Sequence, residues 1–413
     1  MAFPFHIQEH ILDGAHMREY ACATANSQED ILSLHVKQYT PIDNPHPQKG
    51  DITVIGAHAN GFPKEMYEPL WSDLYHQLKQ GGVHIRSICT IDAAWQGQSG
   101  LLNSGKLGND PSWLDYSRDI YQVIGALRLP QPLVAVGHSF GGAALVNTSL
   151  MNPRLFTSII LLDPVIEVIN GPSAGTLVNK RSPVAMSVFR RDTWPSRVEA
   201  EKSFSKNAFY QSWDPRALQL WLEYGLTDTQ DGKVALTTSK HQEVRTFVRS
   251  SSKAFNADGS KIIDPRRIPD ADPNHPQTQI SWPVYRPESS TTWDHLPRVR
   301  PTVLYIFGGQ SNIGNRASRN KKVFHTGTGI GGSGGVTVGK VKQVVGEEYG
   351  HLIPMENPKL CADAAASWIV QHLPSWQAED TEFQEFAKQP AQVKSFMGQD
   401  IFDFFSKTRQ SKL

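Results

Sequence analysis

A ten-residue stretch, residues 133–142 (LVAVGHSFGG), constrains this chain more than any other. Its first four residues are apolar and predict a short buried strand, and the apolar run after it predicts a helix. Ser139 lies at the corner between them, as the centre of G-x-S-x-G, a turn so tight that it favours glycine at positions 137 and 141. This corner presents the serine hydroxyl to the first helical turn, so Ser139 is a candidate nucleophile. The alternative is a glycine-rich turn with an incidental serine.

Composition excludes several functions. The chain has 413 residues, enough for one large domain with an insertion or for two domains. A net charge of +1 gives no overall field for nucleic acid or an anionic membrane. No apolar run approaches the roughly 20 residues of a membrane span, and the N-terminus lacks the pattern of a secretory signal. Cys22, Cys89 and Cys361 predict reduced intracellular thiols and fit no metal spacing, and we expect neither metal nor cofactor.

The C-terminus carries a targeting pattern. The chain ends in Ser411-Lys412-Leu413, the tripeptide that the peroxisomal import receptor binds, and polar residues precede it. We therefore expect that receptor as a partner and the peroxisomal matrix as the location. The segment upstream is rich in phenylalanine, which we expect to dock on the body of the protein or on a second subunit in a homodimer. These residues are Phe383, Phe386, Phe396, Phe402, Phe404 and Phe405.

Strands that alternate with helices predict an α/β fold, with a mostly parallel sheet covered by helices on both faces. The alternation is lost from about residue 165 to 295, where tryptophans, prolines and short helical pieces predict an inserted, mainly helical cap. The expected domains are a core of residues 1–164 and 296–376, a cap of 165–295, and a tail of 377–413 with the targeting signal. The expected strands are 17–24, 31–38, 51–57, 83–91, 133–136, 156–162, 301–307 and 341–345.

Ligands of such sheets bind beyond the carboxyl ends of the strands. Ser139, Asp163, His351 and the segment 60–62 each follow a predicted strand, so we expect them to meet at one edge of the sheet. A serine at its ordinary pKa needs a base within hydrogen-bond reach. Among the 15 histidines, His351 stands between the last predicted strand and a helix, which places it above the nucleophile. His351 is therefore the expected base.

An acid should orient this histidine and stabilise its charged form. The usual place for this acid is the segment after the strand 301–307, but residues 308–312 contain no carboxylate, whereas Asp163 ends the preceding strand. We expect Asp163 to be the acid. The alternatives are that it only caps a turn, or that Glu347 or Glu348 supplies the carboxylate from the same turn as His351.

The oxyanion of an acyl-transfer reaction needs two hydrogen-bond donors. One is the backbone N–H of Phe140, directly after the nucleophile. The other should come from the loop after the third predicted strand, and we expect the N–H of Phe62. We also place His58, Asn60 and His138 near the substrate, with loop support by His58 and packing of His138 as the alternatives.

Together these residues resemble the α/β-hydrolase superfamily over most of the chain outside the cap and tail. More narrowly, the chain resembles fungal peroxisomal hydrolases of secondary metabolism, which include the acyl-CoA hydrolase of mycophenolic acid biosynthesis and relatives from host-selective toxin clusters. The resemblance implies the α/β-hydrolase fold, a thioesterase activity and Asp163 as the acid; Asn60 replaces the usual histidine of the oxyanion loop. It rests on the segments 57–65 (AHANGFPKE), 137–142 (GHSFGG), 162–164 (LDP), 350–351 (GH) and 411–413 (SKL).

We therefore expect a serine hydrolase that cleaves an acyl-CoA thioester through an acyl-serine intermediate. The main alternative is a carboxylic ester hydrolase or lipase with the same triad; a lactonase, a carbon–carbon bond hydrolase and a non-catalytic binding protein are further alternatives. Coenzyme A carries phosphates, which need cations near the site. The first third of the cap is rich in cations, of which Arg190 and Arg191 are the expected contacts, with a solvated helix face as the alternative. The others are Lys180, Arg181, Arg197 and Lys202.

Overall fold

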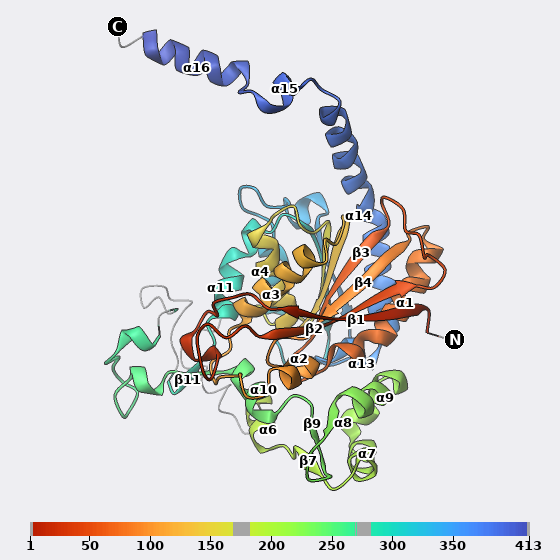
Figure 1. Ribbon diagram of the computed structural model, residues 1–413, viewed down its shortest axis with the longest axis vertical. Coiled ribbons are helices and arrows are strands. Elements are labelled where there is room, and N and C mark those ends of the chain that lie inside the picture. Colours follow the sequence, from red (N-terminus) through yellow and green to blue (C-terminus); the bar gives the residue numbers. More distant parts are fainter. Residues whose placement is uncertain (1–2, 168–181, 269, 271–281, 411–413) are drawn as a thin grey trace. The chain divides into compact units, whose positions relative to one another are not determined.

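An eight-stranded sheet forms the centre of the computed structural model, which describes residues 3–167, 182–268, 270 and 282–410 (Figure 1). The strand order is β1-β2-β4-β3-β5-β6-β12-β13. The pairs β1–β2 and β2–β4 are antiparallel, and the other pairs are parallel. The predicted α/β class and mostly parallel sheet are therefore confirmed. The strands are β1 (Phe5–Asp13), β2 (Ser33–Pro41), β3 (Ile52–Ala57), β4 (Ile85–Ile91), β5 (Leu133–His138), β6 (Ser158–Leu162), β12 (Thr302–Gly308) and β13 (Val341–Gly346).

Helices cover both faces of this sheet because its central strands are apolar on both sides. In β5, Leu133 and Ala135 belong to a buried cluster that also contains the apolar faces of α3 (Trp113–Ala126) and α4 (Phe140–Met151). Side chains alternate along a strand, so the residues between them face the other side. There, Trp71 of α1 (Glu68–Gln80) lies against Gly56 of β3. The carboxyl ends of the parallel strands are left free for loops.

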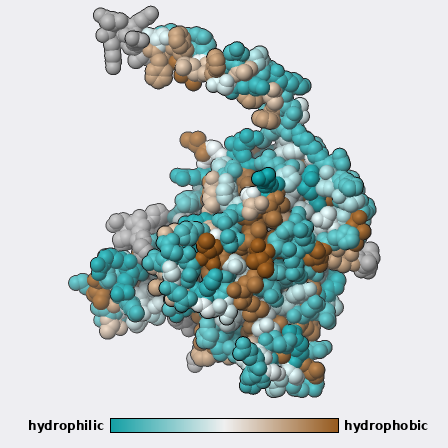
Figure 2. Space-filling model, viewed as in Figure 1, coloured by the Kyte–Doolittle hydropathy of each residue, from teal (hydrophilic) through white to brown (hydrophobic). Residues whose placement is uncertain are grey.

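The first strand differs from the prediction. Residues 17–24 were expected to form it, but β1 is Phe5–Asp13, and the expected segment contains a 3₁₀ turn, Ala21–Ala23, and an isolated bridge from Thr24 to Leu107. The reason is that β1 is an edge strand whose Ile7 and Ile11 are exposed, so its apolar positions do not mark a buried face. Hydrophobic side chains gather in the middle of the face shown in Figure 2, over the β1–β2 ribbon.

Between β6 and β12 the chain leaves the main sheet and forms the insertion that was predicted as a cap. Its described part contains short strands as well as helices, in a β7-β9-β8 sheet and a β10-β11 pair. The helices are α6 (Pro183–Phe189), α7 (Arg197–Ser205), α8 (Ala208–Gln211), α9 (Pro215–Tyr224), α10 (Lys240–Phe247) and α11 (Glu288–His295). The strands are β7 (Thr193–Trp194), β8 (Leu226–Asp228), β9 (Val234–Leu236), β10 (Arg249–Ser250) and β11 (Val284–Tyr285).

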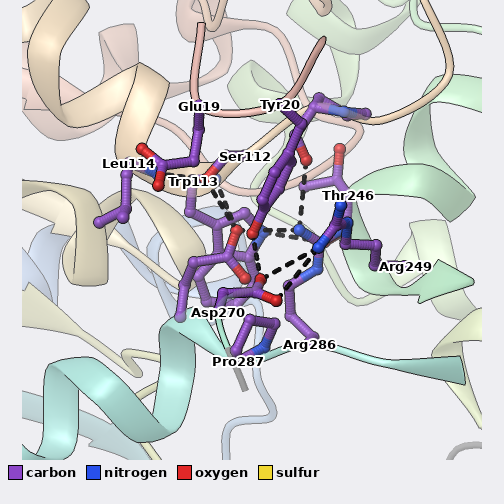
Figure 3. Close-up of polar contacts among 12 residues, drawn as sticks. Glu19, Tyr20, Ser112, Trp113, Leu114, Thr246, Arg249, Asp270, Arg286 and Pro287 are labelled. Atoms are coloured by element: carbon purple, nitrogen blue, oxygen red, sulfur yellow. Dashed lines mark hydrogen bonds and ion pairs between the residues drawn. The ribbon is translucent and has the colours of Figure 1, made fainter. Parts of the chain in front are cut away.

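A buried arginine joins this insertion to the core. Arg249 of β10 donates from Nε and Nη2 to the two carboxylate oxygens of Asp110, each at 2.8 Å, and from Nη1 to Asp270. The ring of Tyr20 lies over the guanidinium, 3.5 Å from Cζ to the ring centroid, and its hydroxyl donates to Asp270 (Figure 3). Beside this group, Arg286 pairs with Glu288 at 2.9 Å. These contacts satisfy charges that would be costly to bury alone.

The chain divides into two compact units, residues 1–370 and 371–413, so the core and the insertion lie in the same unit. No helix among the described residues has the length and apolar character to cross a membrane. The remaining helices of the first unit are α2 (Gly97–Leu102), α12 (Arg316–His325) and α13 (Ile353–Glu356). Helix α14 (Pro358–Ala387) runs from the first unit into the second, which continues with α15 (Ala391–Ser395) and α16 (Gln399–Gln410).

Candidate active site

Ser139 occupies a strained corner between β5 and α4. Its backbone angles are φ 57° and ψ −123°, a conformation that residues other than glycine rarely adopt. The two flanking glycines are required by close contacts: a Cβ at Gly137 would lie 2.7 Å from Leu145 Cδ1, and one at Gly141 would lie 2.4 Å from the carbonyl oxygen of His58. The G-x-S-x-G pattern therefore has the physical basis expected from the sequence, a turn that holds the serine at the helix N-terminus.

The structure brings Ser139, His351 and Asp163 together from three different loops. His351 follows β13 and Asp163 follows β6. His351 Nδ1 lies 2.6 Å from Asp163 Oδ2, and His351 Nε2 lies 3.0 Å from Ser139 Oγ. An ionised carboxylate only accepts, so Nδ1–H donates to Asp163 and Nε2 accepts from the serine hydroxyl. This is the arrangement of a nucleophile, a general base and an orienting acid.

A serine that the sequence did not point to also contacts the acid. Ser311, in the loop after β12, donates its hydroxyl to Asp163 Oδ2, and its Oγ accepts the N–H of Ile313 at 3.1 Å. This loop is where we noted the missing carboxylate, and a hydroxyl stands there instead. Glu347 and Glu348, the alternative acids, are both exposed.

Glu356 of α13 is a second residue that the sequence did not point to. Its Oε2 accepts the N–H of Gly350 at 2.7 Å, directly before His351. Burial raises the pKa of the Glu356 carboxyl, and the N–H of Gly350 opposes that shift. Glu356 therefore supports the backbone of the loop that carries the base. Its signal in the sequence is weak, because it is one acid among many at the start of a helix.

The two expected oxyanion donors, the N–H groups of Phe140 and Phe62, differ in whether they already have a hydrogen-bond acceptor. Phe140 is the first residue of α4, and N–H groups of a first helical turn have no acceptor within the helix. The N–H of Phe62, in contrast, donates to the carbonyl oxygen of Ala59 at 3.2 Å across a turn in which Gly61 has φ 83°. In the structure this N–H closes a turn of its own loop, and the role of Phe62 as the second oxyanion donor stays a prediction.

Side-chain contacts hold the same loop from several directions. His58 is 1% exposed; its Nε2 accepts the N–H of Ala93 at 2.9 Å, and its Nδ1–H donates to Ala59 O at 2.8 Å. Gln96 accepts the N–H of Gly61 at 2.8 Å. His58 was expected to contact the substrate, with support of this loop as the alternative. In the structure it is buried and supports the loop.

Asn60 joins this loop to the insertion. Its side chain donates to the carbonyl oxygen of Glu243 in α10 at 2.9 Å and accepts from Gln96 Nε2 at 2.7 Å. The ring of Phe62 contacts Trp213 and Trp221 of the insertion, at 5.8 Å between centroids in each pair. The insertion therefore packs directly on the loop that would bind the oxyanion.

His138, the residue before the nucleophile, is fully buried. Its Nδ1 lies 2.8 Å from the hydroxyl oxygen of Tyr67, and its Nε2 lies 2.9 Å from the backbone oxygen of His351. Burial, followed by the nearby ring of His351, lowers its pKa well below the usual value. Both ring nitrogens are committed to protein groups, so His138 packs in the site rather than lining a substrate pocket.

The two arginines expected to bind phosphate lie in different surroundings. Arg190 Nη1 pairs with Glu243 Oε2 at 2.8 Å, and Ser187 donates to the other carboxylate oxygen at 2.7 Å. Arg191 is exposed, donates from Nε to Thr193 O at 2.8 Å, and lies over the ring of Trp194. Arg190 is therefore engaged in the insertion, whereas Arg191 faces solvent.

Some of the predicted residues lie outside the part of the chain that the structure describes. They are Lys180 and Arg181 of the insertion and the terminal Ser411, Lys412 and Leu413. Among the described residues, no group of three or more histidine, cysteine, aspartate and glutamate side chains is placed to hold a metal ion.

Comparison with known proteins shows to which family the chain belongs. The profile of the alpha/beta hydrolase family matches residues 54–364. The type I acyl-CoA thioesterase mpaH′ of Penicillium brevicompactum is 37% identical over 407 residues, which cover 92% of this chain and 91% of that protein. The type I acyl-CoA thioesterase mpaH of Penicillium roqueforti is 35% identical, over 93% and 92% of the two chains. Among solved structures, the peroxisomal alpha-beta-hydrolase Lpx1 of Saccharomyces cerevisiae superposes with a TM-score of 0.66 at 17% identity, covering 99% of this chain and 97% of that chain.

Proposed function

Because this chain belongs to the alpha/beta hydrolase family and is therefore a hydrolase, we propose that its substrate is an acyl-CoA thioester, cleaved through an acyl–Ser139 intermediate. One observation carries the proposal. The contacts at 3.0 Å and 2.6 Å that join Ser139, His351 and Asp163 occur in a chain similar, over nine-tenths of its length, to proteins named acyl-CoA thioesterases.

The first half-reaction transfers the acyl group to the enzyme. Ser139 Oγ attacks the thioester carbonyl carbon while His351 Nε2 takes the hydroxyl proton, and Asp163 stabilises the imidazolium that forms. The carbonyl oxygen becomes an oxyanion beside the N–H of Phe140. Phe62 is the proposed second donor: its 3.2 Å bond to Ala59 is at the long end of the normal range, so the N–H can be shared with the substrate.

Collapse of the oxyanion breaks the carbon–sulfur bond. The thiolate of coenzyme A leaves and takes the proton from His351. Water then attacks the acyl–Ser139 ester while His351 accepts a proton from it. Collapse of this second oxyanion releases the carboxylic acid, and His351 returns the proton to Ser139 Oγ, which restores the hydroxyl. A thiolate leaves more readily than an alkoxide, so protonation of the leaving group by His351 matters less here than in the cleavage of an oxygen ester.

A substrate panel tests this proposal. The purified protein is assayed with acyl-CoA thioesters of different acyl groups and with matched oxygen esters of the same acyl groups. We expect a higher kcat/KM for the thioester with the preferred acyl group. A preference for oxygen esters in every matched pair would reject the thioesterase proposal and favour the ester hydrolase or lipase alternative.

The tail suggests a location and two partners. We propose that Ser411-Lys412-Leu413 binds the peroxisomal import receptor and directs the protein to the peroxisomal matrix. The structural neighbour Lpx1 is named a peroxisomal hydrolase, which agrees with this proposal. Two further points remain proposals. The first is the set of domain limits, at 1–164, 165–295, 296–376 and 377–413. The second is that the aromatic tail docks on the body or on a homodimer partner, and sedimentation of the full chain would test the homodimer.

A further inference from the structure

Three hydrogen bonds in series, two of them buried and the third partly buried, join the oxyanion loop to the backbone of His351. The N–H of Ala59 lies 2.8 Å from the hydroxyl oxygen of Tyr67. That hydroxyl lies 2.8 Å from His138 Nδ1, and His138 Nε2 lies 2.9 Å from the backbone oxygen of His351. Ala59, Tyr67 and His138 are at most 3% exposed, so water does not compete for the two contacts of the Tyr67 hydroxyl, whereas the contact with His351 O is partly buried.

The two backbone groups at the ends of this series fix which atom donates in each hydrogen bond. A backbone N–H can only donate and a backbone carbonyl can only accept, so Ala59 donates to Tyr67 and His138 Nε2–H donates to His351 O. The remaining hydroxyl proton of Tyr67 therefore points at His138 Nδ1, which accepts it. Every polar atom of Tyr67 and His138 is then satisfied with a neutral imidazole. The titratable groups around this imidazole are the ring of His351, at 5.1 Å between centroids, His58 and Tyr67, with Cys361 beyond Tyr67.

We propose that Tyr67 and His138 are positioning residues, which hold the oxyanion loop and the backbone of His351 in register with Ser139. This inference rests on the proposed function only in assigning the base and the nucleophile. This series of hydrogen bonds links three segments that must stay aligned for catalysis: the loop after β3, the residue before the nucleophile, and the loop after β13. Reaction rates are sensitive to such alignment, because a displacement of about 1 Å can cost about 100-fold.

The test compares deletions of buried hydroxyls. Tyr67→Phe removes the central link, and we expect it to lower kcat about tenfold or more with KM within about threefold of wild type. Tyr305→Phe is the matched control: Tyr305 is also buried, and its hydroxyl shares a 2.7 Å hydrogen bond with Thr326, away from the site. We expect this variant to lose stability but keep its kcat. Equal losses of kcat in the two variants, or no loss in Tyr67→Phe, would overturn the proposal.

The histidine is tested by a conservative rescue. His138→Leu removes the donor to His351 O, whereas His138→Gln keeps an N–H of similar reach. The readout is the second-order rate at which a fluorophosphonate labels Ser139, in samples whose folding is verified by circular dichroism. We expect His138→Gln to label at least about tenfold faster than His138→Leu, and Tyr67→Phe to add little to the loss in the His138→Leu background. Equal rates in the Leu and Gln variants, or fully additive losses, would contradict a shared positioning role.

This readout separates the two proposals. Fluorophosphonate labelling requires an activated serine aligned with its base and the oxyanion loop, and it does not depend on acyl-CoA as the substrate. If the wild-type protein cleaves no acyl-CoA but Tyr67→Phe still slows labelling relative to Tyr305→Phe, the substrate proposal fails and the positioning role stands.

Discussion

The hydroxyl of Ser311 donates to Asp163 Oδ2, the same oxygen that accepts the Nδ1–H of His351. Asp163, the proposed acid, lies in the loop after β6, and the next loop along the sheet, after β12, contributes a neutral donor to it. A carboxylate is stabilised by each hydrogen bond that it accepts in its charged form. The Ser311 hydroxyl thus helps to fix the carboxylate oxygen that faces His351.

Substitutions of Asp163 and Ser311 separate the orientation of His351 by Asp163 from the support of Asp163 by Ser311. Asp163→Asn should leave the protein folded but lower kcat by up to about 10⁴-fold, because the amide holds the wrong imidazole tautomer. Ser311→Ala should lower kcat only about tenfold, since Asp163 keeps its contact with His351. Steady-state kinetics on both variants provides the check. An active Asp163→Asn variant together with inactive Glu347 or Glu348 substitutions would place the acid elsewhere.

The nucleophile and the base should behave as one unit. Ser139→Ala and His351→Ala should each lower kcat by roughly 10⁴-fold or more, and the double substitution should cost little beyond either single one. Activity within about tenfold of wild type in either variant would reject the assignment.

The sequence predicted the strands with buried apolar runs and the residues that directly follow them. Ser139, His351 and Asp163 each follow a strand, and a parallel sheet must bring such positions to one edge. It did not predict β1, whose apolar side chains are exposed on an edge strand. It also could not reveal Ser311, Glu356 or Tyr67, because a hydroxyl, a helical acid and a tyrosine carry no distinctive spacing. Their roles depend on contacts between loops that only the folded chain defines.

Two buried histidines predict a loss of stability in mild acid. Burial lowers the pKa of His58, and burial together with His351 lowers that of His138 well below 6.5. Below about pH 6.5 the unfolded chain takes up protons at these histidines that the folded chain does not, so the contribution of these two histidines to the free energy of unfolding falls as pH falls. Each histidine contributes a slope of up to about 1.4 kcal/mol per pH unit.

Urea denaturation at several pH values between about 7 and 5 checks this dependence. His138→Gln removes one of the two groups and should reduce the slope relative to wild type. Identical slopes in the two proteins would show that His138 is not a buried neutral histidine.

The two arginines of the insertion should respond differently. Arg191 is exposed and remains the proposed phosphate contact, so Arg191→Ala should raise KM for an acyl-CoA more than for the same acyl group on a short neutral thiol. Salt should reduce this difference, because exposed charges are screened. Arg190→Ala should lower kcat for both thioesters instead, because Arg190 pairs with Glu243, whose backbone oxygen holds Asn60. Equal changes in KM for both thioesters would remove Arg191 from the coenzyme site.

The targeting proposal predicts a change in location without a change in activity. Deletion of residues 411–413 should leave the kinetics of the purified protein unchanged and move a fluorescent fusion, tagged at the N-terminus, from peroxisomes to the cytosol. Peroxisomal fluorescence that persists after the deletion, in cells without a full-length copy to import it, would contradict the proposal.

The most direct measurement is a single turnover with equal concentrations of protein and acyl-CoA, quenched in acid and analysed by mass spectrometry. The wild-type protein should release coenzyme A and carry one acyl group on the peptide that contains Ser139, and Ser139→Ala should show neither. Release of coenzyme A from Ser139→Ala at the wild-type rate, without an adduct in either protein, would contradict the acyl–Ser139 mechanism.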